Sequence, residues 1–331
     1  MDAKQIFKSF NGLKVLVIGD VMIDAYTWGK VERVSPEAPV PVLSWQSEEK
    51  RLGGAANVAL NLKALGAKVC LCSIIGNDAA GKDFKKLLKK ERLSTNGISV
   101  LPSRRTTVKT RMIASGQHLL RVDKEDRHEL TKEEEKELIE NSLNRTMESF
   151  HPDIILFQDY NKGLLTKRII AFVLKWARQK KIPTIVDPKY RNFFAFQECT
   201  LFKPNLKEVN AILGEKVNSN LKSLSRADVL LREKLKNKLT MITLSEKGIF
   251  ISNGKQKKII PTIPRNIADV CGAGDTVVSI AALGLALGLP LNVIGMLSNL
   301  AGGQVCEKPG VVAVDKNQLL GEFVKVGEEL Y

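Results

Sequence analysis

The sequence predicts an α/β fold, in which a doubly wound, mostly parallel sheet is flanked by helices and a second, small sheet lies beside it. Two observations support this prediction. Short apolar runs rich in β-branched residues alternate with amphipathic helical patterns along most of the chain, which is typical of parallel sheets. The chain has 331 residues, 44% of them hydrophobic, so it can form a large core and is not globally disordered.

Five short apolar runs are the predicted strands of the large sheet, at residues 14–19, 68–75, 153–157, 182–186 and 239–243. The predicted helices cover residues 55–65, 132–150, 167–180, 224–236 and 277–289. Open sheets of this class bind ligands beyond the carboxyl ends of their strands. We expect a common cleft there, because four aspartates follow predicted strands: Asp20, Asp24, Asp159 and Asp187.

Two segments interrupt the alternation of strand and helix. Residues 33–45 are extended and contain several prolines, which suits an edge strand. Residues 106–123 form two predicted strands around the turn Ser115-Gly116. Together these segments predict a small sheet that acts as a lid, at about residues 24–50 and 104–124, within a single domain of residues 1–331.

The chain carries a net charge of +15, which alone could indicate nucleic acid, an anionic membrane or small anionic substrates. The basic runs at residues 82–92, 175–181 and 232–238 interleave apolar residues at helical spacing. This is the pattern of helices with one solvated face. We therefore expect neither a nucleic-acid partner nor a membrane partner, and favour a small anionic substrate.

The remaining composition indicates a cytoplasmic protein. Five cysteines without C-x-x-C spacing favour a reduced compartment, and three scattered histidines give no zinc site. The first residues mix acids and bases, so we expect no signal peptide or anchor. The longest apolar run, residues 277–289, is shorter than the roughly 20 residues of a bilayer span.

The stretch Asp269-Val-Cys-Gly-Ala-Gly-Asp-Thr276 places a turn of small residues and a carboxylate directly before an apolar helix. The first N–H groups of a helix lack internal partners and attract anions. A carboxylate beside such a site suggests proton abstraction during phosphoryl transfer. The alternative is an ordinary turn leading into a capped helix, and the stretch alone does not decide between them.

Two further motifs have similar alternatives. The paired glycines Gly53 and Gly54 allow a ligand to approach the backbone, and Asn57 offers a donor and an acceptor to a hydroxylated ligand. Asn205 and Glu208 lie on one side of a predicted helix start, where they could hold the water shell of Mg²⁺. They could equally cap the helix reciprocally.

Together these three motifs resemble the ribokinase-like (PfkB-type) carbohydrate kinases, in the order found in that family. Gly53-Gly-Ala-Ala-Asn-Val-Ala59 is similar to the first family signature, the Asp269–Asp275 stretch to the second, and Pro204-Asn-Leu-Lys-Glu208 to the N-x-x-E motif between them. The resemblance covers most of the chain. It implies a ribokinase-like fold and an ATP-dependent sugar kinase.

Other segments narrow the resemblance to the kinase part of D-glycero-β-D-manno-heptose-7-phosphate kinases. They are residues 19–24, 33–42, 158–163, 186–189 and 243–248. The H-x-G-H motif of a fused nucleotidyltransferase does not occur, so we expect a stand-alone kinase. The alternatives are another sugar or sugar-phosphate kinase, acting on ribose, fructose or tagatose phosphate, and an inactive sugar-binding regulator.

This resemblance implies roles for individual residues. Asp275 is the expected base, and the backbone N–H groups of Gly272, Ala273 and Gly274 form the expected anion hole. An ordinary Asp pKa would suffice, because the proton moves only as the bond to phosphorus forms. The expected substrate-binding residues are Asp20, Asp24, Gly53, Gly54, Asn57, Arg111, Asp159 and Lys162.

The resemblance also implies a nucleotide site. Its implied residues are Lys189, Asn205, Glu208, Ser245, Gly248 and Asn299, with Asn205 and Glu208 reaching Mg²⁺ through water. The implied cofactors are ATP and Mg²⁺, and the sequence leaves a K⁺ requirement open. Strand edges on the lid suggest a homodimer joined through the lids.

One residue departs from the family pattern. Cys271 stands where the family often has threonine. We expect activity to survive, because the backbone N–H groups remain. A thiol near a helix start can have a lowered pKa, so oxidation sensitivity is also expected.

Overall fold

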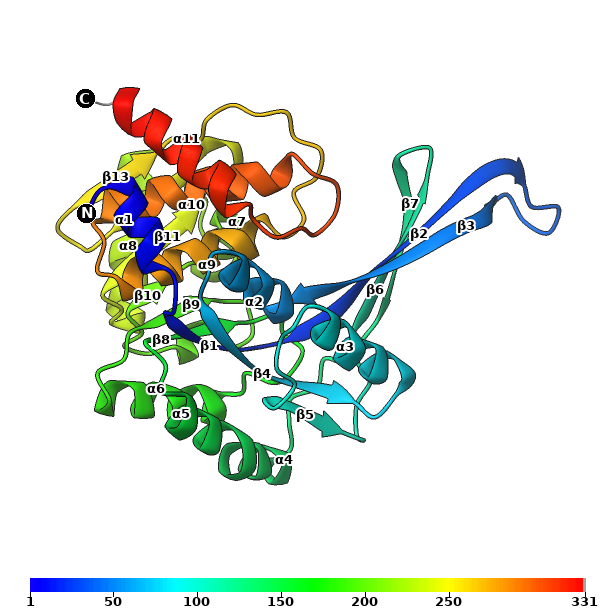
Figure 1. Cartoon of the computed structure of the whole chain (residues 1–331), viewed down its shortest axis with the longest axis horizontal. Helices are drawn as coiled ribbons and strands as arrows, with labels where there is room; N and C mark the ends of the chain where they lie inside the picture. Colours follow the sequence, from blue (N-terminus) through cyan, green and yellow to red (C-terminus); the bar gives the residue numbers. More distant parts are fainter. Residues whose placement is uncertain (330–331) are drawn as a thin grey trace.

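The computed structural model describes residues 1–329 and contains a nine-stranded sheet, helices on both faces of it and a separate four-stranded sheet (Figure 1). The strand order of the large sheet is β13-β12-β11-β10-β9-β8-β1-β4-β5. Neighbours from β11 to β5 pair in parallel, whereas β12 and β13 add an antiparallel edge. The mostly parallel sheet predicted from the sequence is therefore confirmed.

The strands of the large sheet are short. They are β1 (Lys14–Gly19), β4 (Lys68–Gly76), β5 (Ile98–Leu101), β8 (Ile154–Gln158), β9 (Thr184–Asp187), β10 (Leu201–Phe202), β11 (Leu239–Thr243), β12 (Ile249–Ser252) and β13 (Lys257–Ile260). Each of the five predicted strands is present, with ends shifted by at most a few residues. The sequence did not predict β5, β10, β12 or β13.

The helices form two layers, each packed on one face of the large sheet. One layer contains α1 (Ala3–Ser9), α2 (Ala55–Ala64), α3 (Ala79–Lys90), α9 (Ala273–Ala286), α10 (Leu291–Cys306) and α11 (Lys316–Glu329). The other contains α4 (Lys132–Leu138), the π-helical η1 (Ile139–Leu143), α5 (Asn144–Phe150), α6 (Lys167–Gln179), α7 (Leu206–Leu213) and α8 (Leu221–Leu235). Short 3₁₀ helices lie at η2 (Phe193–Ala195) and η3 (Ser245–Lys247).

The side chains of β1 show why this sheet needs two helical layers. Val15 and Val17 face the core with α2 and α9, whereas Leu16 and Ile18 face the core with α6 and α8. All four are fully buried. A strand covered on both faces reads as a continuous apolar run, which explains why the sequence predicted this element well.

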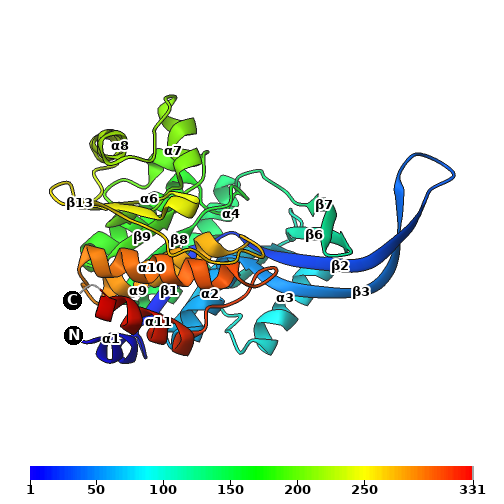
Figure 2. The same cartoon turned by 90° about the horizontal axis from the view of Figure 1, so that it is seen from above.

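The small sheet projects from the body and has the order β3-β2-β6-β7 (Figures 1 and 2). Its strands are β2 (Val21–Val34), β3 (Pro41–Gly54), β6 (Val108–Ala114) and β7 (Gln117–Lys124). The predicted turn between β6 and β7 is present, with Ser115 and Gly116 at positive φ. The structure thus confirms a second, separate sheet.

One prediction about this sheet was partly wrong. Residues 33–45 do not form one strand, because β2 ends at Val34 and β3 begins at Pro41. The prolines of the intervening tip cannot donate hydrogen bonds to a neighbouring strand, and the chain reverses there with a hydrogen bond from Ser35 N to Val40 O (2.8 Å). The edge position itself was predicted correctly, since β3 is an edge strand.

Within residues 1–329, no helix has the length and apolar character needed to cross a membrane. All five cysteines are unpaired.

Candidate active site

Asp275 lies in the first turn of α9 and is almost completely buried. Its Oδ2 accepts a hydrogen bond from Asn57 Nδ2 (2.8 Å). Its Oδ1 accepts bonds from Tyr160 Oη (2.7 Å) and Gln158 Nε2 (3.1 Å). Gln158 Nε2 also donates to Asp187 Oδ2 (3.1 Å) at the end of β9. Segments from four parts of the chain therefore meet around one carboxylate.

The environment of Asp275 changes its protonation. The pKa of Asp275 is raised to about 7, mainly by burial and also by the neighbouring Asp187. The hydrogen bonds from Asn57 and Tyr160, and the nearby Lys203, oppose this rise. The sequence required only an ordinary Asp pKa and did not reveal how completely the carboxyl group is buried. A pKa near neutrality suits a general base.

The start of α9 has the geometry of an anion site. The first bond within the helix runs from Thr276 N to Gly272 O (3.0 Å), so the N–H groups before it have no acceptor inside the helix. Ala273 N makes a long bond to Val270 O (3.4 Å). Of the three predicted anion-hole donors, Ala273 N thus has a weak backbone acceptor, whereas no bond among the described residues uses Gly272 N or Gly274 N. Gly272 is left-handed (φ 80°), and a Cβ there would lie 2.9 Å from Asn57 Nδ2.

The paired glycines end β3 at the base of the small sheet, beside Asp24 of β2. A Cβ on Gly53 would lie 2.0 Å from Asp24 Oδ2, and one on Gly54 (φ 60°) would lie 2.5 Å from Asp20 O. Both positions therefore require glycine. The other oxygen of Asp24 pairs with Arg111 of β6 (2.5 Å). The structure thus brings Gly53, Asp24 and Arg111, all predicted substrate residues, into one group of contacts.

Asp20 has a different set of partners. Its carboxylate accepts backbone N–H bonds from Tyr160 (2.9 Å), Lys162 (3.0 Å) and Leu164 (3.3 Å). These bonds fix the loop after β8. Burial raises the pKa of Asp20, although the three N–H groups lower it. Its predicted contact with the sugar stays a prediction.

Two more predicted substrate residues lie on this loop. Asp159 is buried, its Oδ1 accepts a bond from Asn161 N (2.7 Å), and its Oδ2 has no partner within the described chain. Burial and the neighbouring Asp20 raise the pKa of Asp159 to about 7. Lys162 Nζ lies 2.6 Å from Glu125 Oε2. Both residues thus lie on the loop after β8, and Lys162 already has an acidic partner.

The predicted magnesium pair forms the capping arrangement that the sequence had left as its alternative. Asn205 Oδ1 accepts from Glu208 N (2.8 Å), and Glu208 Oε2 accepts from Asn205 N (2.9 Å). Glu208 also contacts Lys189 Nζ through its other oxygen. Burial lowers the pKa of Lys189, but Asp187 and Glu208 outweigh burial and leave it raised. A charged lysine beside a buried carboxylate is suited to bind a nucleotide's phosphates and its metal ion.

The described residues contain no cluster of three or more His, Cys, Asp or Glu side chains arranged around a metal. Mg²⁺ in nucleotide sites usually takes one or two carboxylates and keeps several waters. The pair of Asn205 and Glu208 is compatible with such a site. Its role toward Mg²⁺ stays a prediction.

The other predicted nucleotide residues lie around the end of β13. A Cβ on Gly248 (φ 97°) would lie 2.0 Å from Ile260 O, and Asn299 Nδ2 donates to the same oxygen (2.8 Å). Ser245 precedes them at a positive φ of 57°. Gly248 and Asn299 are therefore neighbours, although they are far apart in the sequence.

Comparison with known families identifies the class of this site. A family model described as pfkB family carbohydrate kinase matches residues 13–317. The chain belongs to the pfkB family of carbohydrate kinases. The family resemblance found in the sequence is thereby confirmed, and the chain is a sugar kinase.

Among the relatives of this pfkB family chain is the bifunctional protein HldE of Trichlorobacter lovleyi, 40% identical over 325 residues. The bifunctional protein HldE of Geobacter sulfurreducens is 38% identical over 323 residues. Each match covers 97% of this chain and 65% of the relative. The chain therefore spans about two thirds of the length of these curated relatives.

Solved structures confirm the ribokinase-like fold. Phosphofructokinase-2 from Escherichia coli in complex with potassium superposes with a TM-score of 0.76 at 19% identity, covering 95% of this chain and 99% of that one. Ribokinase of Arabidopsis thaliana complexed with ribose and ATP gives a TM-score of 0.72 at 17% identity, with coverages of 94% and 99%. At these identities the likeness shows the fold alone.

Sequence reasoning missed three polar side chains of this pfkB family site: Gln158, Tyr160 and Lys203. The first two directly bond Asp275, and Lys203 pairs with Asp187 (3.0 Å). A signal for two of them was available, since Gln158 and Tyr160 flank the predicted Asp159 at a strand end. Lys203 follows a strand of two residues, β10, that the sequence did not predict.

Cys271 contradicts the expectation of a reactive thiol. Burial, together with the neighbouring Asp269, raises the pKa of Cys271 to about 11. A neutral thiol is a poor nucleophile. The helix start does not reverse this effect, because the carboxylate of Asp269 lies next to the thiol and its Oδ1 accepts from Cys271 N (3.0 Å).

We therefore predict that a thiol-alkylating reagent modifies Cys271 slowly at neutral pH. Cys70 provides an internal comparison, because it is also partly buried but a hydrogen bond with Cys72 lowers its pKa. Peptide mass spectrometry over time should show labelling of Cys70 before Cys271, with activity retained. Faster labelling of Cys271 would contradict the assignment of a raised pKa.

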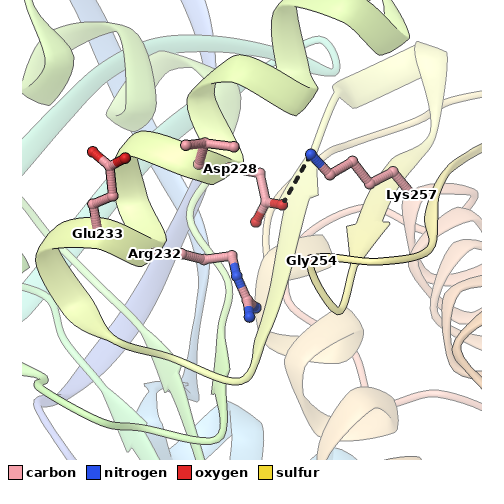
Figure 3. Close-up of a pocket in the computed structure, with 6 residues that line it drawn as sticks. Asp228, Arg232, Glu233, Gly254 and Lys257 are labelled. Atoms are coloured by element: carbon pink, nitrogen blue, oxygen red, sulfur yellow. Dashed lines mark ion pairs between the residues drawn. The ribbon is translucent and has the colours of Figure 1, made fainter.

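A hollow of about 320 Å³ lies away from this site, between α8 and the turn from β12 to β13 (Figure 3). Asp228, Arg232 and Lys257 line it, and Asp228 Oδ2 lies 4.0 Å from Lys257 Nζ. Ser252 pairs with Thr240 near the amino end of β11, so the hollow lies at the opposite end of the strands from Asp187. It has no part in the active site.

Proposed function

We propose that this chain transfers the γ-phosphoryl group of ATP to the anomeric hydroxyl of D-glycero-β-D-manno-heptose 7-phosphate, giving the 1,7-bisphosphate for ADP-heptose and lipopolysaccharide core synthesis. The observation that carries the proposal is the buried Asp275 carboxylate beside the unpartnered Gly274 N–H at the start of α9. The resemblance of residues 33–42 and 158–163 to heptose phosphate kinases supports the substrate. The HldE relatives support it too, since they match nearly the whole chain.

In this proposal Asp275 takes the proton of the sugar's anomeric hydroxyl as that oxygen attacks phosphorus. The N–H groups of Gly272, Ala273 and Gly274 stabilise the charge that develops on the transferred group. Positioning and electrostatic stabilisation account for most catalysis of phosphoryl transfer. Asp24, Gly53, Gly54 and Asn57 orient the sugar, and Arg111, Asp159 and Lys162 complete its binding site.

ATP with Mg²⁺ supplies the phosphoryl group and neutralises part of its charge. On the protein side, Lys189 binds phosphate oxygens, and Asn205 and Glu208 hold the metal's water shell. Ser245, Gly248 and Asn299 line the nucleotide site. Lys203 forms an ion pair with Asp187 and stabilises its carboxylate. One solved structure of similar fold is a complex with potassium, and assays in potassium and in sodium salts test whether this chain requires K⁺.

The small sheet is proposed to act as a lid and as the dimer interface. Its outer strands β3 and β7 have unpaired edges, which are natural pairing surfaces. Large apolar side chains are exposed on this sheet and its tip: Val31, Val34, Val40, Trp45, Leu119, Leu120 and Val122. Exposed apolar patches of this kind often mark interfaces. Light scattering should give the mass of a dimer, and a monomer at working concentration would refute the interface.

A substrate panel tests the proposed activity. We expect ADP release to have its highest kcat/KM with heptose 7-phosphate, and much lower values with ribose, fructose 6-phosphate and tagatose phosphate. Heptose without phosphate is the matched control for recognition of the 7-phosphate. A clear preference for one of the other sugars would move the chain to another branch of the family.

A further inference from the structure

Tyr160 contacts the proposed base, and the mechanism above gives it no role. Its side chain is partly buried, and its hydroxyl donates to Asp275 Oδ1 (2.7 Å). Gln158 donates to the same oxygen at 3.1 Å but divides its amide between Asp275 and Asp187. The hydrogen bond from Tyr160 is therefore shorter than the one from Gln158, and Tyr160 donates to Asp275 alone.

The loop that carries Tyr160 is held from several sides. Asp20 accepts its N–H groups, as described above, and Arg104 Nη2 donates to Lys162 O (3.0 Å) and to His128 O (2.9 Å). Asn161 and Gly163 adopt positive φ, and a Cβ on Gly163 would lie 1.9 Å from His128 O. Such a loop fixes the tyrosine hydroxyl relative to the base.

We propose that Tyr160 is a positioning residue for the phosphoryl transfer: its hydroxyl orients the Asp275 carboxylate toward the sugar hydroxyl and favours its charged form. The proposal rests on the proposed function, because it takes Asp275 as the base. A carboxylate has about four lone-pair sites, and Asn57, Gln158 and Tyr160 fill three of them. One site is left to accept the substrate proton.

The charges around Asp275 agree with this role. Asp187 of β9 opposes the charged form, while Lys203 after β10 favours it. Burial and the nearby Asp275 and Asp187 raise the pKa of Tyr160 well above its ordinary value, so the phenol stays protonated and remains a donor. Asn57 of α2 and Gln158 of β8 are neutral donors and keep their state at any working pH.

The test variant is Tyr160→Phe, which keeps the ring that lies beneath Lys189 Nζ (5.8 Å from the ring centre). We expect kcat at pH 7 to fall about tenfold to a hundredfold, the range for one hydrogen bond to a charged group, with KM for the sugar nearly unchanged. The hydrogen bond lowers the pKa of Asp275, so its loss should move the acidic limb of the kcat profile to higher pH. The control is Tyr190→Phe, whose side chain is 48% exposed.

Two further variants separate positioning from a general structural defect. In an Asp275→Asn background, Tyr160→Phe should have little additional effect, because it acts through Asp275. Replacing Tyr160 by a fluorinated tyrosine keeps its shape and strengthens the donor, so the acidic limb should move to lower pH. This variant keeps the test decisive even where Tyr160→Phe folds poorly.

The proposal is overturned where Tyr160→Phe shows the kcat and pH profile of Tyr190→Phe, or where the fluorinated enzyme has an unshifted limb. It is also overturned where Tyr160→Phe lowers kcat as much in the Asp275→Asn background as in the wild type. The wild-type assay distinguishes these failures from a failure of the proposed function. Without heptose 7-phosphate turnover by the wild type, the proposed activity itself is wrong.

Discussion

Asp275→Asn is expected to lower kcat by about a thousandfold or more, while ATP binding is retained. The amide keeps the shape of the side chain but cannot accept the sugar proton. Asn57 donates to one oxygen of the native carboxylate, and Gln158 and Tyr160 donate to the other. The amide N–H₂ group replaces one of these oxygens, so it also removes an acceptor from one side. Single-turnover kinetics measure the loss of chemistry, and calorimetry measures nucleotide affinity.

Asp315→Asn is the matched control for this variant. Asp315 also lies at a helix start, where its Oδ1 accepts from Asn317 N (2.9 Å) and Gln318 N (3.0 Å). Asparagine caps helices about as well as aspartate, so near-normal turnover is expected. Near-normal turnover in Asp275→Asn as well would remove Asp275 from the role of base.

Arg111→Met is expected to have the largest effect on stability, at about 3 to 5 kcal/mol of the free energy of unfolding, the range for breaking a buried ion pair. Arg111 and Asp24 are both almost completely buried, and their charges meet at 2.5 Å. Without the guanidinium, the Asp24 carboxylate is left without its cationic partner. The substitution also removes the cation stacked on Tyr26, 5.3 Å from its ring centre. Urea denaturation measures the change.

Arg121→Met provides the comparison from the neighbouring strand. Arg121 is paired directly opposite Arg111 in the register of β6 and β7. Its side chain is 55% exposed and pairs with Asp123, so its removal should cost at most about 1 kcal/mol. Equal destabilisation by the two variants would show that the buried ion pair of Arg111 and Asp24 contributes no more to stability than an exposed one.

The sequence predicted the local features of the fold well. Both faces of β1 are covered, so its apolar run was unambiguous, and the Ser115-Gly116 turn has a strong sequence signal. The tip between β2 and β3 was harder, because prolines fit an edge strand and a hairpin tip equally. The π-helical η1 inside the predicted helix of residues 132–150 had no signal that we could identify.

The sequence predicted those residues of the candidate site that lie in short motifs. It did not predict the contacts between residues that are far apart in the chain. Asp275, Gly53 and Asn205 were found from short motifs. The bond between Tyr160 and Asp275 joins residues 115 positions apart, and local patterns contain no information about such a contact. The raised pKa values of Asp275 and Cys271 have the same origin, since burial is a property of the assembled fold.

The most direct test of the central claim is the position of the phosphate that the enzyme adds. Purified protein, ATP with Mg²⁺ and heptose 7-phosphate should give a product with two phosphorus resonances, of which the new one couples to the anomeric proton. Asp275→Asn under the same conditions should give none. A new phosphate on any other carbon, or none with the wild type, would contradict the account.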